Sequence, residues 1–215
     1  MRKENYPPEY KLSNLEDRSL INYFMRQPHK FIGRKYKNFK GDVLELGCGD
    51  GNNIKYFKNY KTYTYSDKNW NFFNDKNDGI PKTKKILFDL EDENYSLIEN
   101  KYDLYLLFNV LEHVQDVHNV LRRLYNSMKP GAEMVLAQPN DPSFIWDLGE
   151  IFGSFIAPID RRTYHYHQSR EHINHIKQLH NMFKYYFPDV EISYLPMRVN
   201  IRSLNFFRIY IVKKI

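Results

Sequence analysis

The stretch VLELGCGDGNN, residues 43–53, combines closely spaced glycines with carboxylates directly after an apolar run. Its glycines are Gly47, Gly49 and Gly51, three of only nine in the 215-residue chain. Because glycine has no side chain, such a turn lets the backbone approach a bound ligand closely. Glu45 and Asp50 would repel a phosphate and attract a cation. The stretch therefore indicates a turn that binds a positively charged ligand.

Two phosphate-binding patterns fit this stretch less well. A P-loop ends in Gly-Lys-Ser/Thr, whereas Asn52 and Asn53 follow the last glycine here. A dinucleotide fingerprint needs Gly-x-Gly-x-x-Gly before a helix, and here the third glycine comes one residue early. For the stretch taken alone, a purely structural glycine turn remains the other alternative.

The elements around the turn alternate between strand-like and helix-like segments over residues 40–140. The predicted strands, apolar or rich in β-branched and aromatic residues, are GDVLELG, KTYTYSD, KKILFDL, YDLYLLFNV and AEMVLAQP. VEISYLP and NFFRIYIVKKI predict a closing antiparallel pair whose order is open. We therefore predict an α/β fold with a doubly wound, mostly parallel, seven-stranded sheet.

Two predicted helices flank the strands that would carry the site. HVQDVHNVLRRLYNSMKPG has apolar residues at helical spacing, which predicts a helix that starts at His113 and ends at Pro130-Gly131. Asn52 and Asn53 are predicted to cap a helix that continues through Tyr60. Residues 171–187 are also predicted to be helical.

With these elements in order, LELGCGDG resembles motif I of the class I S-adenosylmethionine-dependent methyltransferases, an acidic residue followed by Gly-x-Gly-x-Gly. FNVLEHV and MKPGAEMVLAQPN are similar to segments of the ubiquinone- and menaquinone-type small-molecule methyltransferases. The resemblance implies a Rossmann-like methyltransferase fold. It also implies S-adenosyl-L-methionine as cofactor, whose cationic groups suit the acidic residues, and S-adenosyl-L-homocysteine as product.

The same resemblance implies roles for residues at the ends of the predicted strands. Asp67 would accept the ribose hydroxyls. Asp89 would bind the adenine amino group, and the backbone amide of Leu90 would meet the ring. The backbone around Asn109 and Val110 would border the methionine part. The full predicted cofactor-binding set is Glu45, Gly47, Cys48, Gly49, Gly51, Asp67, Lys68, Asp89, Leu90, Asn109 and Val110.

Methyl transfer from an activated donor needs mainly alignment, and a hydroxyl acceptor also needs a base. His113, after the fourth strand, is the leading candidate base, and Glu112 is expected to be structural or a loop anchor. His165 and His167 are further candidates, because the segment after the fifth strand commonly covers the acceptor in such enzymes. The segment EHINH lacks metalloprotease spacing, so no metal is predicted. Cys48 is expected to be a small filler without nucleophilic activity.

The predicted function is methyl transfer to a small molecule, most directly to a hydroxyl of a sugar, a polysaccharide precursor or a quinone-like ring. An RNA methyltransferase is the alternative, because the net charge is +6 and GRKYKNFK interleaves basic and aromatic residues. A cofactor-binding subunit without catalysis is a third possibility. The sequence does not specify the acceptor atom or the oligomeric state.

The chain is predicted to form one domain. Residues 1–36 would form an N-terminal helical cap, residues 37–215 the cofactor-binding methyltransferase domain, and residues 140–180 an acceptor lid within it. A single cysteine and the absence of an apolar N-terminal segment or spanning run predict a cytoplasmic protein without a membrane span.

Overall fold

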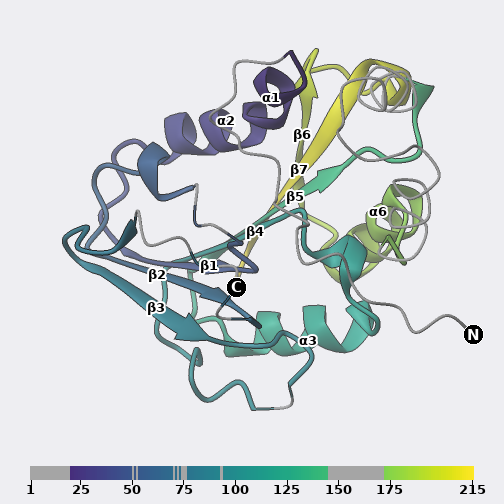
Figure 1. Ribbon diagram of the computed structural model, residues 1–215. Helices are drawn as coiled ribbons and strands as arrows, with labels where there is room; N and C mark the ends of the chain where they lie inside the picture. The colour runs from purple at the N-terminus through teal and green to yellow at the C-terminus, as the bar shows by residue number, and fades with distance from the viewer. Residues whose placement is uncertain are drawn as a thin grey trace, which may run out of the picture.

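The computed structural model describes residues 20–49, 51, 53–69, 71, 73, 77–92, 94–144 and 172–215. Its centre is a seven-stranded sheet with the order β3-β2-β1-β4-β5-β7-β6 (Figure 1). The five parallel strands are β1 (Asp42–Leu46), β2 (Thr62–Asp67), β3 (Thr83–Leu87), β4 (Leu104–Phe108) and β5 (Glu133–Pro139).

The last two strands, β6 (Glu191–Pro196) and β7 (Asn205–Lys213), close the sheet in antiparallel fashion. β7 pairs with β5 and β6 lies outside it, which gives the order that the sequence left open. The predicted fold class, including the antiparallel pair, is confirmed.

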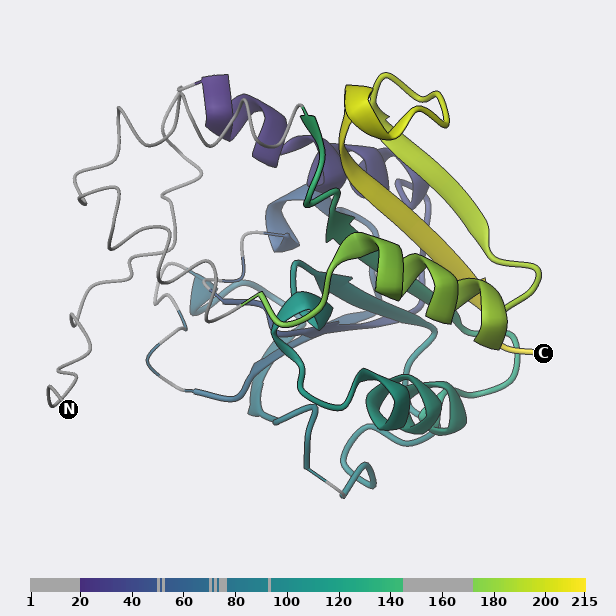
Figure 2. The same cartoon turned by 90° about the vertical axis from the view of Figure 1, so that its right-hand side faces the viewer.

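Helices cover both faces of the sheet, as a central strand buried on both sides requires. On one face, α1 (Leu20–Met25) and α2 (Gln27–Lys35) lie together, and Ile32 of α2 is fully buried there. On the other face lie α3 (Val117–Ser127) and α6 (Ile176–Tyr186), which bury Leu121 and Phe183 (Figures 1 and 2). β4, buried along its whole length, runs between these two layers. No helix in the described ranges is long and apolar enough to cross a membrane.

The helix after the fourth strand starts later than the sequence predicts. α3 begins at Val117, where the side chain of Asp116 caps it by accepting a hydrogen bond from Asn119 N at 3.1 Å. His113 instead belongs to the short 3-10 turn η4 (Leu111–His113). The prediction of a helix from His113 is therefore wrong, because the Asp116 cap sets the first turn.

The predicted helix after the glycine turn is replaced by a single 3-10 turn, η1 (Ile54–Tyr56). Asn53 makes no side-chain cap bond, because its amide is used in a buried contact with Glu45. A further 3-10 turn, η5 (Arg202–Leu204), precedes β7. The other predicted capping residue, Asn52, lies outside the described residues, as does most of the predicted 140–180 lid.

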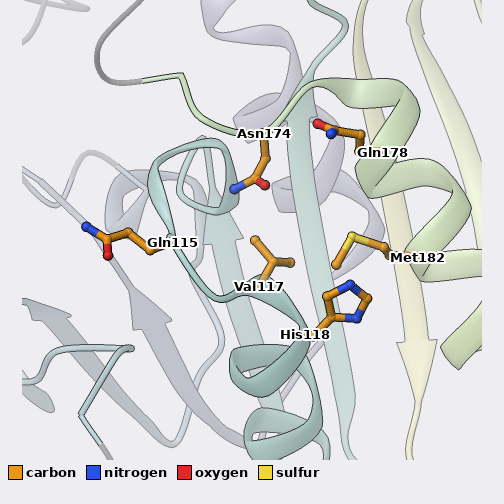
Figure 3. Close-up of a pocket in the computed structure, with 6 residues that line it drawn as sticks. All are labelled: Gln115, Val117, His118, Asn174, Gln178 and Met182. Atoms are coloured by element: carbon orange, nitrogen blue, oxygen red, sulfur yellow. The ribbon is translucent and has the colours of Figure 1, made fainter.

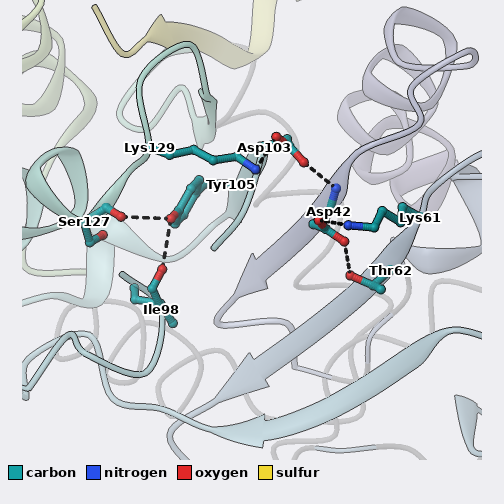
Figure 4. Close-up of polar contacts among 8 residues, drawn as sticks. All are labelled: Asp42, Lys61, Thr62, Ile98, Asp103, Tyr105, Ser127 and Lys129. Carbon is teal, nitrogen blue, oxygen red and sulfur yellow. Dashed lines mark hydrogen bonds and ion pairs between the residues drawn. The ribbon is translucent and has the colours of Figure 1, made fainter. Parts of the chain in front are cut away.

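Polar contacts tie together the amino-terminal ends of the parallel strands (Figure 4). Asp42, which begins β1, accepts a hydrogen bond of 2.7 Å from Thr62 Oγ1, and its backbone N–H donates to Asp103 Oδ2 at 2.8 Å. The hydroxyl of Tyr105 donates to the carbonyl oxygens of Ile98 and Ser127. These contacts stabilise one edge of the sheet, and the opposite edge is where α/β sheets bind ligands.

Candidate active site

The glycine turn after β1 adopts a backbone that only glycine enters easily. Gly47, Gly49 and Gly51 have φ angles of 64°, 53° and 70°. A Cβ on Gly47 would lie 2.6 Å from Cγ2 of Val110, and one on Gly51 would lie 2.5 Å from Nδ2 of Asn77. The three glycines are therefore required by conformation, and two of them also by space.

Asp67 ends β2 beside this turn. Its Oδ2 accepts a hydrogen bond of 2.9 Å from Gly49 N, and its Oδ1 accepts a longer one of 3.4 Å from Asn69 N. Only 7% of Asp67 is exposed, and burial raises the pKa of its carboxyl in spite of these hydrogen bonds. The structure thus places a partly desolvated carboxylate against the glycine turn, where the sequence predicts ribose binding.

Glu45 lies beneath the turn, almost fully buried. Its Oε1 accepts a hydrogen bond of 2.6 Å from Asn53 Nδ2, and its Oε2 accepts one of 2.7 Å from the hydroxyl of Tyr63. Burial and the neighbouring Glu45 charge raise the pKa of Tyr63, so this phenol stays a donor. These contacts fix Glu45 in place at the base of the turn, and its predicted contact with the cofactor stays a prediction.

His29 of α2 extends this network, and sequence reasoning missed it. Its Nδ1 hydrogen bonds to Asn53 Oδ1, and its ring stacks between Phe108, at 4.9 Å between centroids, and Tyr56, at 5.8 Å. Burial lowers the pKa of His29 to about 4, so the ring is neutral at pH 7. Since Asn53 Oδ1 is an acceptor, the neutral ring carries its proton on Nδ1. The only sequence signal was a histidine one turn before the core residue Ile32.

The remaining predicted cofactor residues lie along the same edge. Cys48 is buried, and its N–H donates to Ser66 O at 2.9 Å. Lys68, beside Asp67, and Asp89, after β3, are both exposed. Leu90 is buried. The structure therefore brings the predicted set to the carboxyl ends of β1 to β4.

At the ends of β4 and β5, buried polar atoms lie without hydrogen-bond partners in the described part of the chain. They are Oδ1 of Asn109, Oε2 of Glu112, and both amide atoms of Gln138. Asn109 also has a left-handed φ of 53°, and its N–H donates to Ala137 O at 2.9 Å. Because buried polar groups are nearly always paired, such a gathering suits a site that receives polar groups of a ligand.

His113, the predicted base, is half-exposed at this edge. Its ring packs edge-on against His172, with centroids 5.1 Å apart, and its Nε2 lies 4.0 Å from Glu112 Oε1. His172 Nδ1 lies 3.4 Å from Asp141 Oδ2. His165 and His167 lie outside the described residues, and their predicted roles stay predictions. In the ranges that are described, no group of three His, Cys, Asp or Glu residues is arranged to hold a metal ion.

Glu112 anchors the loop through its backbone, as the sequence predicts. In addition, its side chain is a buried carboxyl with a raised pKa. Its carbonyl oxygen accepts hydrogen bonds from Ile173 N at 2.8 Å and Asn174 N at 3.1 Å. Its carboxyl is buried, which raises its pKa to about 7, while the charges of His172 and Asp141 lower and raise it respectively. A carboxyl of this kind can hold or release a proton near neutral pH.

A separate cavity of about 350 Å³ lies between the start of α3 and α6 (Figure 3). Its lining is Gln115, Val117, His118, Asn174, Gln178 and Met182. None of these belongs to the predicted cofactor-binding set, and Asn174 is already engaged through its side-chain amide with the carbonyls of Leu111 and Val114. The cavity therefore lies beside η4 and shares no residue with the predicted cofactor-binding set.

Comparison with known proteins agrees with this geometry. A family model described as "Methyltransferase domain" matches residues 17–186. The chain belongs to this family and is a class I S-adenosylmethionine-dependent methyltransferase. A glycine turn too tight for any side chain, beside a carboxylate that can accept ribose hydroxyls, fits S-adenosylmethionine as the cofactor.

The chain is similar over part of its length to much larger enzymes. It is 25% identical over 146 residues to the highly reducing polyketide synthase ctvA of Aspergillus terreus, a match that covers 58% of this chain and 6% of that protein. Among solved structures, the CurJ carbon methyltransferase superposes with a TM-score of 0.63 at 18% identity, covering 93% of this chain and 56% of that one. The plantazolicin methyltransferase BpumL, solved with SAH, gives a TM-score of 0.64 at 14% identity, with 94% and 88% covered. The chain thus spans a small fraction of the length of such curated relatives.

Proposed function

We propose that this chain transfers the methyl group of S-adenosylmethionine to a small-molecule acceptor whose reacting atom must lose a proton, with His113 as the base. The observation that carries the proposal is the meeting of three features at one edge of the sheet. They are the glycine turn, the Asp67 carboxylate, and a half-exposed imidazole after β4.

Each predicted residue then has one task. The glycine turn lets the backbone approach the cofactor, and Asp67 holds its ribose through the carboxylate. Val110 packs over Gly47 and limits the space beside the turn. When bound, the cofactor supplies an activated methyl group. His113 takes the acceptor's proton, and an imidazole suits this task because it changes charge near neutral pH.

The sequence favours a hydroxyl as the acceptor, and an acidic carbon meets the same chemical requirement. Both carry a proton that a base must remove before or during transfer. One structural neighbour is named a carbon methyltransferase, and the relatives in sequence are polyketide synthases. The acceptor panel should therefore hold both classes of compound.

Transfer of a labelled methyl group to such a panel tests the proposal. The panel contains sugars, dihydroxybenzenes, β-ketothioesters and, as the RNA arm, bulk tRNA. We expect labelling of a small molecule, at least tenfold loss in His113→Gln, and little change in His118→Gln. His118 is the matched control because it contacts Tyr186 instead, at 2.9 Å. Labelling of tRNA alone, or full activity in His113→Gln, would overturn the proposal.

A further inference from the structure

Three separate segments converge around His113. Glu112 and His113 form the end of η4, Asp141 follows β5, and His172 precedes α6. Backbone contacts hold the third segment against the other two, because Ile173 and Asn174 donate to Glu112 O and Ile176 N donates to Asp141 O at 3.1 Å. The fold therefore holds together the three backbone segments that carry these side chains.

The side chains form a continuous series of titratable groups. Glu112 Oε1 lies 4.0 Å from His113 Nε2, the His113 and His172 rings are in contact, and His172 Nδ1 lies 3.4 Å from Asp141 Oδ2. Asp141 is part-buried and can fix the neutral His172 ring with its proton on Nδ1. Glu112 is almost fully buried, so the charge that its carboxyl carries once it has lost its proton acts on His113 with little screening by water.

We propose that Glu112, His172 and Asp141 are positioning residues for His113, and that the four groups together take up the proton that the acceptor loses. This inference rests on the proposed function, in which His113 is the base. It goes beyond that function because it gives roles in proton transfer to the buried carboxyl of Glu112 and to the His172–Asp141 pair.

The proton and electron balance of the step is simple. The O–H or C–H bond of the acceptor breaks, its proton moves to the His113 imidazole, and the electron pair left on the acceptor atom forms the bond to the methyl carbon. The methyl carbon would come from a cofactor held at the glycine turn and Asp67, and the cofactor's sulfur would retain the electron pair of the broken carbon–sulfur bond. The imidazolium that forms lies beside Glu112, whose carboxylate stabilises the new positive charge.

Glu112 is suited to share this proton. Burial brings the pKa of its carboxyl to about 7, so this group can hold or release a proton near neutral pH. Its Oε1 lies 4.0 Å from His113 Nε2, so a proton taken up by the imidazole has a short distance to travel to the carboxyl. The charges of His172 and Asp141 act on the pKa of Glu112 in opposite directions, the first lowering it and the second raising it. The site is therefore suited to acceptors that must lose a proton. An acceptor that is already a neutral nucleophile would gain less from these groups, because it needs no base.

Nuclear magnetic resonance titration of the histidine ring signals, in full-length protein saturated with S-adenosylhomocysteine, tests the inference. We expect His113 to titrate in two steps, as a group coupled to a neighbour does. Glu112→Gln should reduce this to one step, and Asp141→Asn should move the His172 midpoint to lower pH. Glu99→Gln, which removes an exposed carboxylate elsewhere, should leave both curves unchanged.

Single-step curves for both histidines that neither substitution alters would overturn the inference. Asp141→Asn tests the contact between Asp141 and His172 through the His172 midpoint. The inference can therefore be tested even if Glu112→Gln folds poorly. S-adenosylhomocysteine affinity and labelled methyl transfer are measured on the same samples. Uncoupled titration with normal His113-dependent transfer would remove only this inference, whereas transfer that does not depend on His113 would remove the proposed function.

Discussion

The backbone N–H of Gly49 donates a hydrogen bond of 2.9 Å to Oδ2 of Asp67. This bond joins the glycine turn after β1 to the end of β2, so the two parts of the cofactor site are held as one unit. It also uses only part of the hydrogen-bonding capacity of the carboxylate, which can accept further donors. Substitutions in the glycine turn or at Asp67 should therefore reduce cofactor affinity more than they reduce the free energy of unfolding.

Gly47→Ala should reduce both protein stability and cofactor affinity more than a glycine substitution away from the site does. Gly131 is the matched control, because it has a φ of 80° but its missing Cβ meets nothing within 4 Å in the described structure. We expect Gly131→Ala to lower the free energy of unfolding by about 1–2 kcal/mol through backbone strain alone. Gly47→Ala should lower it further, and should also reduce S-adenosylhomocysteine affinity at least tenfold. Denaturant unfolding and calorimetry measure the two effects, and equal behaviour of both variants would contradict the proposed fit.

Asp67→Asn should reduce cofactor affinity by about ten- to a hundredfold, because hydrogen bonds to a charged acceptor contribute about 1.5–3 kcal/mol. Asp42→Asn is the control, since Asp42 begins β1 at the opposite edge of the sheet (Figure 4). The affinities are compared by calorimetry with S-adenosylhomocysteine. A normal affinity in Asp67→Asn would show that the ribose assignment is wrong.

Cofactor affinity should also fall as the pH is lowered. Burial raises the pKa of Asp67, so its carboxyl becomes protonated at a higher pH than an ordinary aspartate. The charged form, which accepts the hydroxyl protons, is present above that pKa and is lost below it. The affinity of Asp67→Asn should show a weaker pH dependence, and identical pH profiles for the two proteins would contradict this account.

His29→Phe should keep the ring stack and lose the hydrogen bond to Asn53. An unpaired buried amide costs about 1–3 kcal/mol, which we expect to see in denaturant unfolding. The pKa of His29 is about 4 in the folded protein and about 6.5 in the unfolded chain. The free energy of unfolding of the wild type should therefore fall as the pH drops from about 6.5 towards 4, because over this range the unfolded chain binds a proton that the folded protein does not bind. His29→Phe should lose this part of the acid sensitivity. His118→Phe, which changes an exposed histidine of α3 on the opposite face of the sheet, is the control.

The pH dependence of stability that comes from Glu112 should run in the opposite direction to that from His29, and Glu112→Gln should remove it. The folded carboxyl keeps its proton up to about pH 7, whereas the unfolded one loses it near 4.5. Wild-type stability therefore falls as the pH rises from 4.5 to 7, by up to about 3 kcal/mol. The glutamine variant should not show this fall. An unchanged slope of unfolding free energy between pH 5 and 7 would count against a raised pKa.

The parts of the fold that follow from local patterns could be predicted from the sequence. β4 is recognisable because it is apolar along its length, and β1 because it runs directly into the glycine turn. Asp67 could be placed because parallel strands bring their carboxyl ends to one edge. Local preference was misleading at Asn53, where a cap was expected and a buried contact with Glu45 formed. Tertiary contacts overrode the local signal there.

The parts that depend on distant contacts could not be predicted. His29 and Asn53 are brought together by the packing of α2 against η1. His172 lies in the histidine-rich stretch, but nothing in its spacing shows that it contacts His113 and Asp141. The backbone contacts of Ile173 and Asn174 with Glu112, and the burial that raises the pKa of the Glu112 carboxyl, likewise belong to the folded chain and leave no local signal.

The most direct measurement is calorimetry of S-adenosylhomocysteine binding to the wild-type chain and to Asp67→Ala at pH 7.5, with ATP and NAD as comparison ligands. We expect one site for S-adenosylhomocysteine on the wild type, much weaker binding to the variant, and little or no heat from either nucleotide. Equal binding to both proteins, or preferred binding of a phosphate-bearing nucleotide, would show that the glycine turn and Asp67 do not form an S-adenosylmethionine site.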